Sequence, residues 1–126
     1  MKRLKPVATV IFAGILAGCA PHYVNLTPNS LPRADAHDYP FEVEWQTRRS
    51  GANNAEVRAY VVIDKQLFPL QRIPQTENRF EGRAPVPRDR QTVLYRFKFA
   101  YSYPGLPGKA VSSDWSPEYR LKLAPQ

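Results

Sequence analysis

The sequence predicts a small all-β domain, an antiparallel sandwich of six to seven short strands, and three observations favour it. Thirteen prolines recur along a chain of 126 residues, and a proline in a helix interior removes a backbone donor and breaks the helix, which excludes a helical bundle. From residue 41 to residue 123, apolar and polar residues alternate with the period of two that is typical of half-buried strands. Turn residues separate the alternating runs, and the length allows one domain.

The predicted strands follow one another with short connections. They cover residues 41–47, 57–63, 66–73, 80–84, 92–103 and 119–123. Asp64-Lys65 offers a tight turn that makes the second and third runs a hairpin. Pro69 cannot donate to a ladder, which predicts that residues 66–73 form an edge or bulged strand. Glu42 and Glu44 share the outer face of the first strand, and their spacing indicates a solvated surface rather than an acid–base pair.

Residues 92–103 give the clearest strand, with large side chains on one face. These are Val93, Tyr95, Phe97, Phe99, Tyr101 and Tyr103. A loop from Pro104 to Gly108 then leads to Trp115 and the closing strand. Short strands with turn signals between them and no helical stretch indicate an immunoglobulin-like sandwich, with a small closed barrel as the alternative.

The first nineteen residues have the features of a bacterial export signal. Three cations precede residues 6–18, thirteen mostly apolar residues that are too few for a membrane span of ~20. The run ends in Leu16-Ala17-Gly18-Cys19, which resembles the lipobox of bacterial lipoproteins. The resemblance implies cleavage before Cys19 and acyl chains such as palmitate on that residue, which hold a protein stably on a membrane. An uncleaved hydrophobic anchor and a plain secretory signal are the alternatives.

The resemblance also implies an address and a division of the chain. Ala20 follows the cysteine where aspartate retains enteric lipoproteins in the inner membrane, so it implies the outer membrane, with the domain facing the periplasm. We expect residues 1–18 to form the signal peptide, residues 19–40 the lipidated cysteine and an extended proline-rich tether, and residues 41–126 the sandwich.

Charge and composition exclude several functions. The whole chain has 18 Lys and Arg against 11 Asp and Glu, and removal of residues 1–18 leaves 15 against 11, a mild excess without a concentrated basic stripe, so we expect no nucleic-acid partner. One cysteine and two histidines in the expected tether cannot supply a structural zinc site without carboxylates. No nucleophile elbow, His-centred triad or phosphate loop is present, so we expect no enzyme, cofactor or metal.

Two groups of residues are candidates for binding. Arg96 and Lys98 lie on the outer face of one predicted strand, and Arg120 and Lys122 lie on the outer face of its expected hairpin partner. Four neighbouring cations repel one another, so either Glu42 and Glu44 neutralise them or an acidic protein or anionic ligand does. Tyr103 and Trp115, at the ends of the loop between the last strands, form the second group, because aromatics with polar edges suit a wet, adhesive surface.

Two stretches resemble known domains. Phe80-Glu81-Gly82-Arg83 through Tyr95-Arg96-Phe97-Lys98-Phe99 resembles the end of early-set immunoglobulin-like domains, including the glycogen-binding type. Residues 95–103 with Asp114-Trp115-Ser116-Pro117-Glu118-Tyr119 are similar to the last two strands of fibronectin type III modules. The sequence therefore favours a non-enzymatic lipoprotein that binds another envelope protein. A glycan-binding module that stacks Tyr103 and Trp115 on sugar rings, and a passive spacer, are the alternatives.

Overall fold

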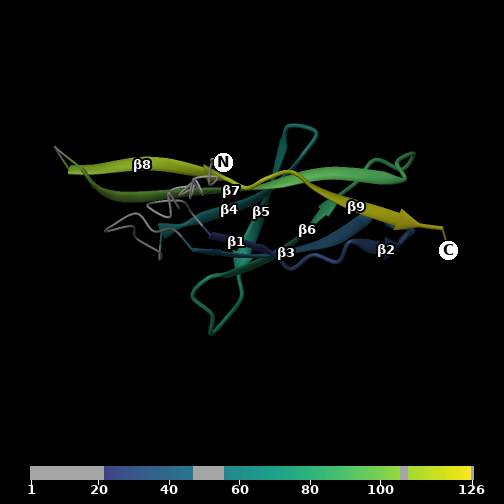
Figure 1. Ribbon diagram of the computed structural model, residues 1–126, viewed down its shortest axis with the longest axis horizontal. Helices are drawn as coiled ribbons and strands as arrows, with labels where there is room; N and C mark the ends of the chain where they lie inside the picture. Colours follow the sequence, from purple (N-terminus) through teal and green to yellow (C-terminus); the bar gives the residue numbers. More distant parts are fainter. Residues whose placement is uncertain (1–21, 47–55, 106–107, 126) are drawn as a thin grey trace, which may run out of the picture.

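The computed structural model describes residues 22–46, 56–105 and 108–125, and they form an all-β domain of mostly antiparallel strands (Figure 1). The strands are β1 (His22–Asn25), β2 (Ser30–Pro32), β3 (Asp38–Gln46), β4 (Arg58–Ile63), β5 (Gln66–Arg72), β6 (Arg79–Pro85), β7 (Thr92–Gly105), β8 (Gly108–Trp115) and β9 (Tyr119–Ala124). This described part of the chain has no helix with the length and apolar character that a bilayer crossing needs.

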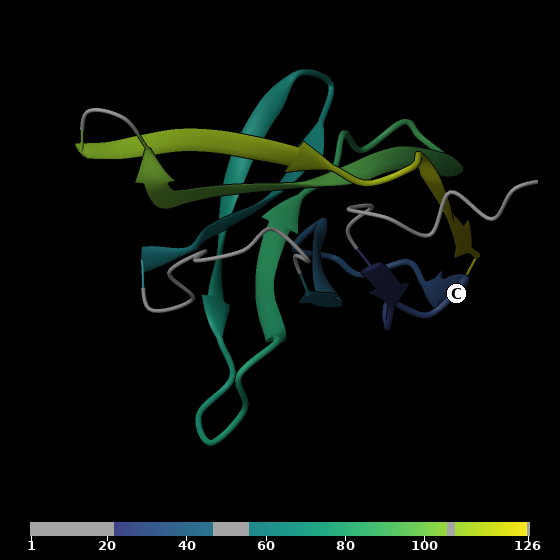
Figure 2. The same cartoon turned by 60° about the vertical axis from the view of Figure 1, so that its left-hand side comes forward.

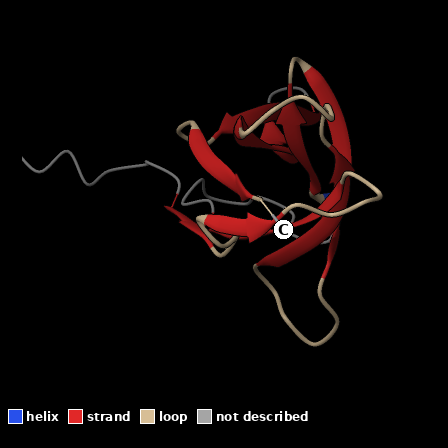
Figure 3. Ribbon diagram, turned by 90° about the vertical axis from the view of Figure 1, so that its right-hand side faces the viewer, coloured by secondary structure: helices blue, strands red, loops and turns tan. Residues whose placement is uncertain are grey.

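The strands form one continuous sheet that curls around a core (Figure 3). Neighbouring strands run in the order β1-β3-β6-β5-β4-β7-β9-β2, and β8 pairs β7 beside this path. The pair of β2 and β9 is parallel, and the other pairs are antiparallel. In the described residues, β5 connects the half of the sheet that contains β3 and β6 to the half that contains β4 and β7. The end strands of this order are β1 and β2. The fold therefore differs from two separate sheets and from a closed barrel.

The core lies between the β3 half of this sheet and the β7 half. Trp45 of β3 stacks on Phe99 of β7 with ring centroids 4.6 Å apart, and Phe41 meets Tyr95 edge-on at 4.9 Å. The alternation predicted for residues 92–103 is confirmed from Val93 to Tyr101, because the odd-numbered side chains there are buried and Leu94 and Arg96 are exposed. Aromatic pairs of this kind add to the burial of apolar area that drives the two halves together.

The β4–β5 hairpin follows the predicted turn, but the expectation for Pro69 needs correction. Asp64 and Lys65 both have positive φ, 51° and 66°, as a two-residue hairpin loop requires. β5 is not an edge strand, because it lies between β4 and β6. Its pairing with β6 covers Gln71 and Arg72, and so begins after Pro69. At Gly82 of β6, an added Cβ would lie 2.9 Å from the Pro69 carbonyl oxygen, so the missing side chain allows this close approach.

The described part of residues 19–40 is not the extended tether that the sequence predicts. β1 pairs β3 from His22↔Gln46 to Asn25↔Val43, and β2 pairs β9 from Ser30↔Lys122 to Pro32↔Ala124. β3 itself begins at Asp38, three residues earlier than expected. The physical reason is that Tyr23 and Leu31 pack against the core, which holds these short strands although Pro28 lies between them and Pro32 ends the second.

The expected loop from Pro104 to Gly108 is a hairpin arm instead. β7 continues to Gly105, and β8 pairs back along it from Gly105↔Gly108 to Lys98↔Trp115. Figures 1 and 2 show this arm reaching past the end of β4, whose ladder with β7 ends at Ala100. The sequence of β8 is rich in small residues and lacks an apolar period, which explains why a strand was not predicted there.

Candidate functional site

The candidate site lies on the outer face of β4, β5 and β7, near the last residue of β8. Because odd-numbered residues of β7 point into the core, Leu94, Arg96 and Lys98 point outward. Cross-strand pairing then places Val62 opposite Arg96, and Trp115 opposite Lys98. One face of the sheet therefore collects side chains from four strands.

Three exposed apolar side chains meet on this face. Leu67, Leu94 and Trp115 are 43%, 46% and 45% exposed. Together with Val62 and Arg96 they line one shallow depression of about 480 Å³, which we call the outer patch. Scattered apolar residues on a surface are ordinary, but a contiguous apolar group with polar side chains around it marks a site of interaction.

Two cations lie close to Trp115. The Arg96 guanidinium carbon is 5.7 Å from the ring centroid, and Lys98 Nζ is 5.2 Å from it. A cation at this distance is attracted by the negative face of an indole ring. Glu118 reaches Arg96 at 3.9 Å, with both side chains about half exposed, so solvent screens that pair. The patch therefore joins apolar surface to positive charge.

The predicted cluster of four cations forms only in part. Arg120 lies opposite Leu94 and Lys122 opposite Thr92, so neither faces Arg96 or Lys98 across the ladder. The reason is that β7 has two successive partners on one side, β9 along residues 92–95 and β8 along residues 98–105. All four cations still lie on the outer face, as a row beside the outer patch.

The expected neutralisation of this row by Glu42 and Glu44 is wrong. Both carboxylates lie on β3, in the half of the sheet across the core from β7, where they face outward. Among the described residues, Lys98, Arg120 and Lys122 form no ion pair. The row therefore keeps positive charge on the surface.

The structure does not assemble Tyr103 and Trp115 into one platform. Trp115 is on the outer face opposite Lys98, whereas Tyr103 follows the inward register of β7 and packs against the core, with its ring 6.3 Å from that of Tyr101. Two aromatic rings on opposite faces of one sheet cannot stack together on a sugar. Trp115 alone remains a candidate.

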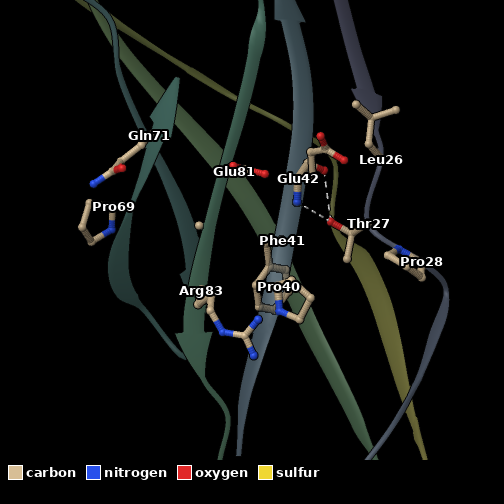
Figure 4. Close-up of a pocket in the computed structure, with 11 residues that line it drawn as sticks. Leu26, Thr27, Pro28, Pro40, Phe41, Glu42, Pro69, Gln71, Glu81 and Arg83 are labelled. Carbon is tan, nitrogen blue, oxygen red and sulfur yellow. Dashed lines mark hydrogen bonds between the residues drawn. The ribbon is translucent and has the colours of Figure 1, made fainter. Parts of the chain in front are cut away.

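A second and larger depression lies on the outer face of the β3 half of the sheet. Figure 4 shows the residues that line it. It has a volume of about 690 Å³ between the segment at Thr27 and strands β3, β5 and β6. Glu42 and Glu81 lie directly opposite each other there, and Arg83 is turned to Asp38 at 2.9 Å. The Thr27 hydroxyl accepts a hydrogen bond from the Glu42 amide at 3.0 Å and donates one to the Glu42 carbonyl at 3.1 Å. Its lining residues include no Cys, His or Ser, so it offers carboxylates without a nucleophile or base of those types.

No metal site is visible in the described ranges, where no three His, Cys, Asp or Glu side chains gather. Burial raises the pKa of Tyr23, Tyr95 and Tyr119, which keeps these hydroxyls protonated, and the Tyr95 hydroxyl accepts a hydrogen bond from Asn25 at 2.7 Å. The predicted lipidation site, Cys19, lies outside the described residues.

Sequence reasoning missed the apolar half of the outer patch. Leu94 occupies a position in strand 92–103 where its neighbours Thr92 and Arg96 are polar. An apolar residue in the polar register of a strand is the signal that could have identified it. Leu67 and Val62 had no comparable signal, because their place beside Leu94 depends on the pairing of strands.

Comparisons with known proteins identify no family. No family model matches the sequence, and no curated protein matches it. Among solved structures, the chain is similar to murine CRIg, an immunoglobulin-like domain, with 9% identity and a TM-score of 0.37 over 83% of this chain and 98% of that one.

Proposed function

We propose that this chain is a non-enzymatic lipoprotein of the bacterial outer membrane that uses its outer patch to bind another protein of the cell envelope. The observation that carries the proposal is the convergence of Leu67, Leu94 and Trp115 in one depression beside a row of cations. Interface centres are enriched in aromatic residues and arginine, and polar residues surround them. A passive spacer has no need of such a cluster.

The charge of the row defines the partner's chemistry. Lys98, Arg120 and Lys122 form no ion pair among the described residues, so an acidic protein surface would offset their mutual repulsion. Complementary charge at the rim raises the rate of encounter, and the apolar centre slows dissociation. We therefore propose a partner with an apolar residue at the centre of its surface and carboxylates around it.

The binding proposal is tested by photo-cross-linking in intact cells. A photoreactive amino acid placed at Leu94 should give one discrete protein adduct, whereas the same group at Glu44, on the outer face across the core, should give none. Reversal of the row by Lys98→Glu and Arg120→Glu should remove the adduct. Equal labelling from both positions, or adducts that survive the reversal, would contradict the proposal.

The membrane address supports an envelope partner and has its own test. The run Leu16-Ala17-Gly18-Cys19 resembles a lipobox, and Cys19→Ala should release the protein into the soluble fraction. The control is Ser30→Ala, an exposed position well past the lipobox that should leave the protein with the membranes. If the Cys19→Ala protein stays bound to membranes, the lipobox interpretation falls.

A second candidate function is glycan binding, and the exposure of Trp115 favours it. An indole ring beside Arg96 and Lys98 could stack on a sugar that carries acidic groups. The chain has two tryptophans, and Trp45 is buried, so a sugar on Trp115 would change the fluorescence of the exposed ring alone. Titration with peptidoglycan fragments separates the candidates, because a saturable change lost in Trp115→Ala would favour the glycan.

A further inference from the structure

The β7–β8 arm ends the sheet in a long edge. β8 pairs β7 along eight residues, and no other described strand pairs it. β9 pairs with β7 on the same side as β8, and β2 pairs with the other edge of β9. In the described part of the chain, no strand occupies the equivalent position beside β8. A free strand edge is a template for another strand.

The hydrogen-bond pattern shows which backbone groups point to this edge. One step beyond the Lys98↔Trp115 end of the β7–β8 ladder, the Ser116 amide donates to the Phe97 carbonyl at 2.9 Å and the Phe97 amide donates to Ser116 Oγ at 2.8 Å, so the backbone groups of Phe97 and Ser116 point toward each other as in a hydrogen-bonded pair. Such pairs alternate with pairs whose N–H and C=O groups point away from the partner strand. By this alternation, Val111, Ser113 and Trp115 present their backbone groups to the free edge.

The side chains leave those groups accessible. The stretch from Ala110 to Ser113 is small apart from Val111 and contains no proline and no charge, the usual devices that block strand pairing; the charged residues of β8, Lys109 and Asp114, flank this stretch. Val111 is 77% exposed, the highest value among the large exposed apolar residues described. Its side chain and that of Trp115 lie on the outer face, the same face that carries the outer patch.

We infer that the partner binds by adding an extended strand to the free edge of β8. This inference rests on the proposed function and specifies how the same partner engages the molecule. Strand addition gives affinity through main-chain hydrogen bonds and specificity through alternate side chains. Here the side chains of the added strand that lie on the outer face are next to Val111, Ser113 and Trp115. Its side chains on the inner face lie beside Asp114.

The two faces of the edge define the added strand. Beside Val111 it carries an apolar residue, and beside Trp115 it carries an acidic residue, because Lys98 Nζ lies 5.2 Å from that ring. Asp114 points inward and accepts a hydrogen bond from the Tyr101 hydroxyl at 3.2 Å. A charged carboxylate is costly to enclose among apolar side chains, so the inward positions of the added strand carry polar residues.

The test places a short photoreactive diazirine side chain at Val111, Ser113 or Trp115 of the full chain in intact cells, and maps each adduct to a residue of the partner. Strand addition predicts that the three positions label three residues of one partner segment. These residues should be two apart in the partner's sequence and should follow the same order along the edge as the three positions. Ser113→Pro removes an N–H that points to the free edge and is not bonded to β7. It should lower the adduct yield from Val111 by about tenfold or more. The matched control, Ser113→Thr, keeps the N–H and the yield.

Each other outcome overturns the inference in a recognisable way. Labels scattered over separate segments of the partner would show docking of a folded surface. Labels on residues of the same chain or of a second copy of β8 would show that the edge is already covered. Adducts from Leu94 but none from β8 would retain the proposed function and reject strand addition, and no adducts from either would reject both.

Discussion

Replacement of Asn25 by alanine measures whether residues 22–32 belong to the fold. Asn25 Nδ2 donates to the Tyr95 hydroxyl at 2.7 Å, and Asn25 Oδ1 accepts from the Thr27 amide at 3.1 Å. Tyr95 is 2% exposed, so water cannot freely replace the lost donor. In a flexible tether, the same substitution would change nothing.

The magnitude follows from the two hydrogen bonds. Each contributes about 0.5–1.5 kcal/mol net, so Asn25→Ala should lower the free energy of unfolding by about 1–3 kcal/mol. Tyr95→Phe removes the other end of the first bond. A double-mutant cycle between Asn25→Ala and Tyr95→Phe should therefore give a coupling of about 0.5–1.5 kcal/mol.

Urea unfolding followed by tryptophan fluorescence provides the measurement, because Trp45 is buried in the core that unfolding exposes. The matched control is Asn29→Ala, since the Asn29 side chain is exposed and its backbone carbonyl alone accepts from Lys122. The control should stay within about 0.5 kcal/mol of the parent. If Asn25→Ala is as neutral as this control, or the coupling is zero, β1 does not stabilise the domain and the argument fails.

Three further predictions use the same unfolding assay. Burial raises the pKa of Tyr23, so the folded state keeps a proton that the unfolded chain releases near pH 10; stability should be full below about pH 10 and fall at higher pH. Tyr23→Phe should reduce that fall, and the remainder comes from Tyr95 and Tyr119, whose pKa values burial also raises. Gly82→Ala should cost about 1–3 kcal/mol, because its Cβ would lie 2.9 Å from the Pro69 carbonyl oxygen, and no loss would mean that β5 and β6 separate easily. For the tryptophan variants, urea unfolding is followed by circular dichroism, because Trp45 is the fluorescent probe of the core. Trp115→Ala should cost less than about 1 kcal/mol and lower the yield of the partner adduct from Leu94, whereas Trp45→Ala should cost about 3–5 kcal/mol; equal costs would place Trp115 in the core.

The sequence is most informative where a strand buries one whole face. Residues 92–103 alternate large and polar side chains, and the structure buries Val93 to Tyr101 on the predicted side. The Asp64-Lys65 turn is equally clear, because few residues tolerate positive φ and a two-residue hairpin needs it twice. Both signals are local, so they survive without knowledge of the tertiary structure.

The sequence is least informative for strands that form because of tertiary contacts and not because of their own residue pattern. β1 has four residues and pairs with β3, and β2 has three residues and pairs with β9, which lies far along the chain. Prolines around them are typical of a linker, and the packing of Tyr23 and Leu31 that overrides this tendency is tertiary. β8 is a strand for the same reason, since β7 supplies the ladder that its small residues do not specify.

The sequence predicts which face of the sheet carries the four cations, but not which residues are their neighbours across the strands. Alternation placed Arg96, Lys98, Arg120 and Lys122 on an outer face, which the structure confirms. It could not show that β9 pairs the first part of β7 and β8 the second, a shift that moves Arg120 away from Arg96 and brings Trp115 to Lys98. A prediction of register depends on strand lengths, which the periodicity does not fix.

The ordered β1 strand also changes what a lipid anchor at Cys19 would do. Three residue steps separate Cys19 from His22, and a fully extended chain advances at most ~3.6 Å per residue, so the first strand would begin within about 11 Å of the lipidated residue. An extended 19–40 tether would have let the domain search far from the membrane for its partner. With β1 and β2 fixed in the sheet, a domain anchored at Cys19 would lack that freedom, and its partner would have to lie at the membrane surface or send an extended segment to it. Strand addition to β8 would meet this requirement, because a flexible segment can reach a domain held close to its anchor.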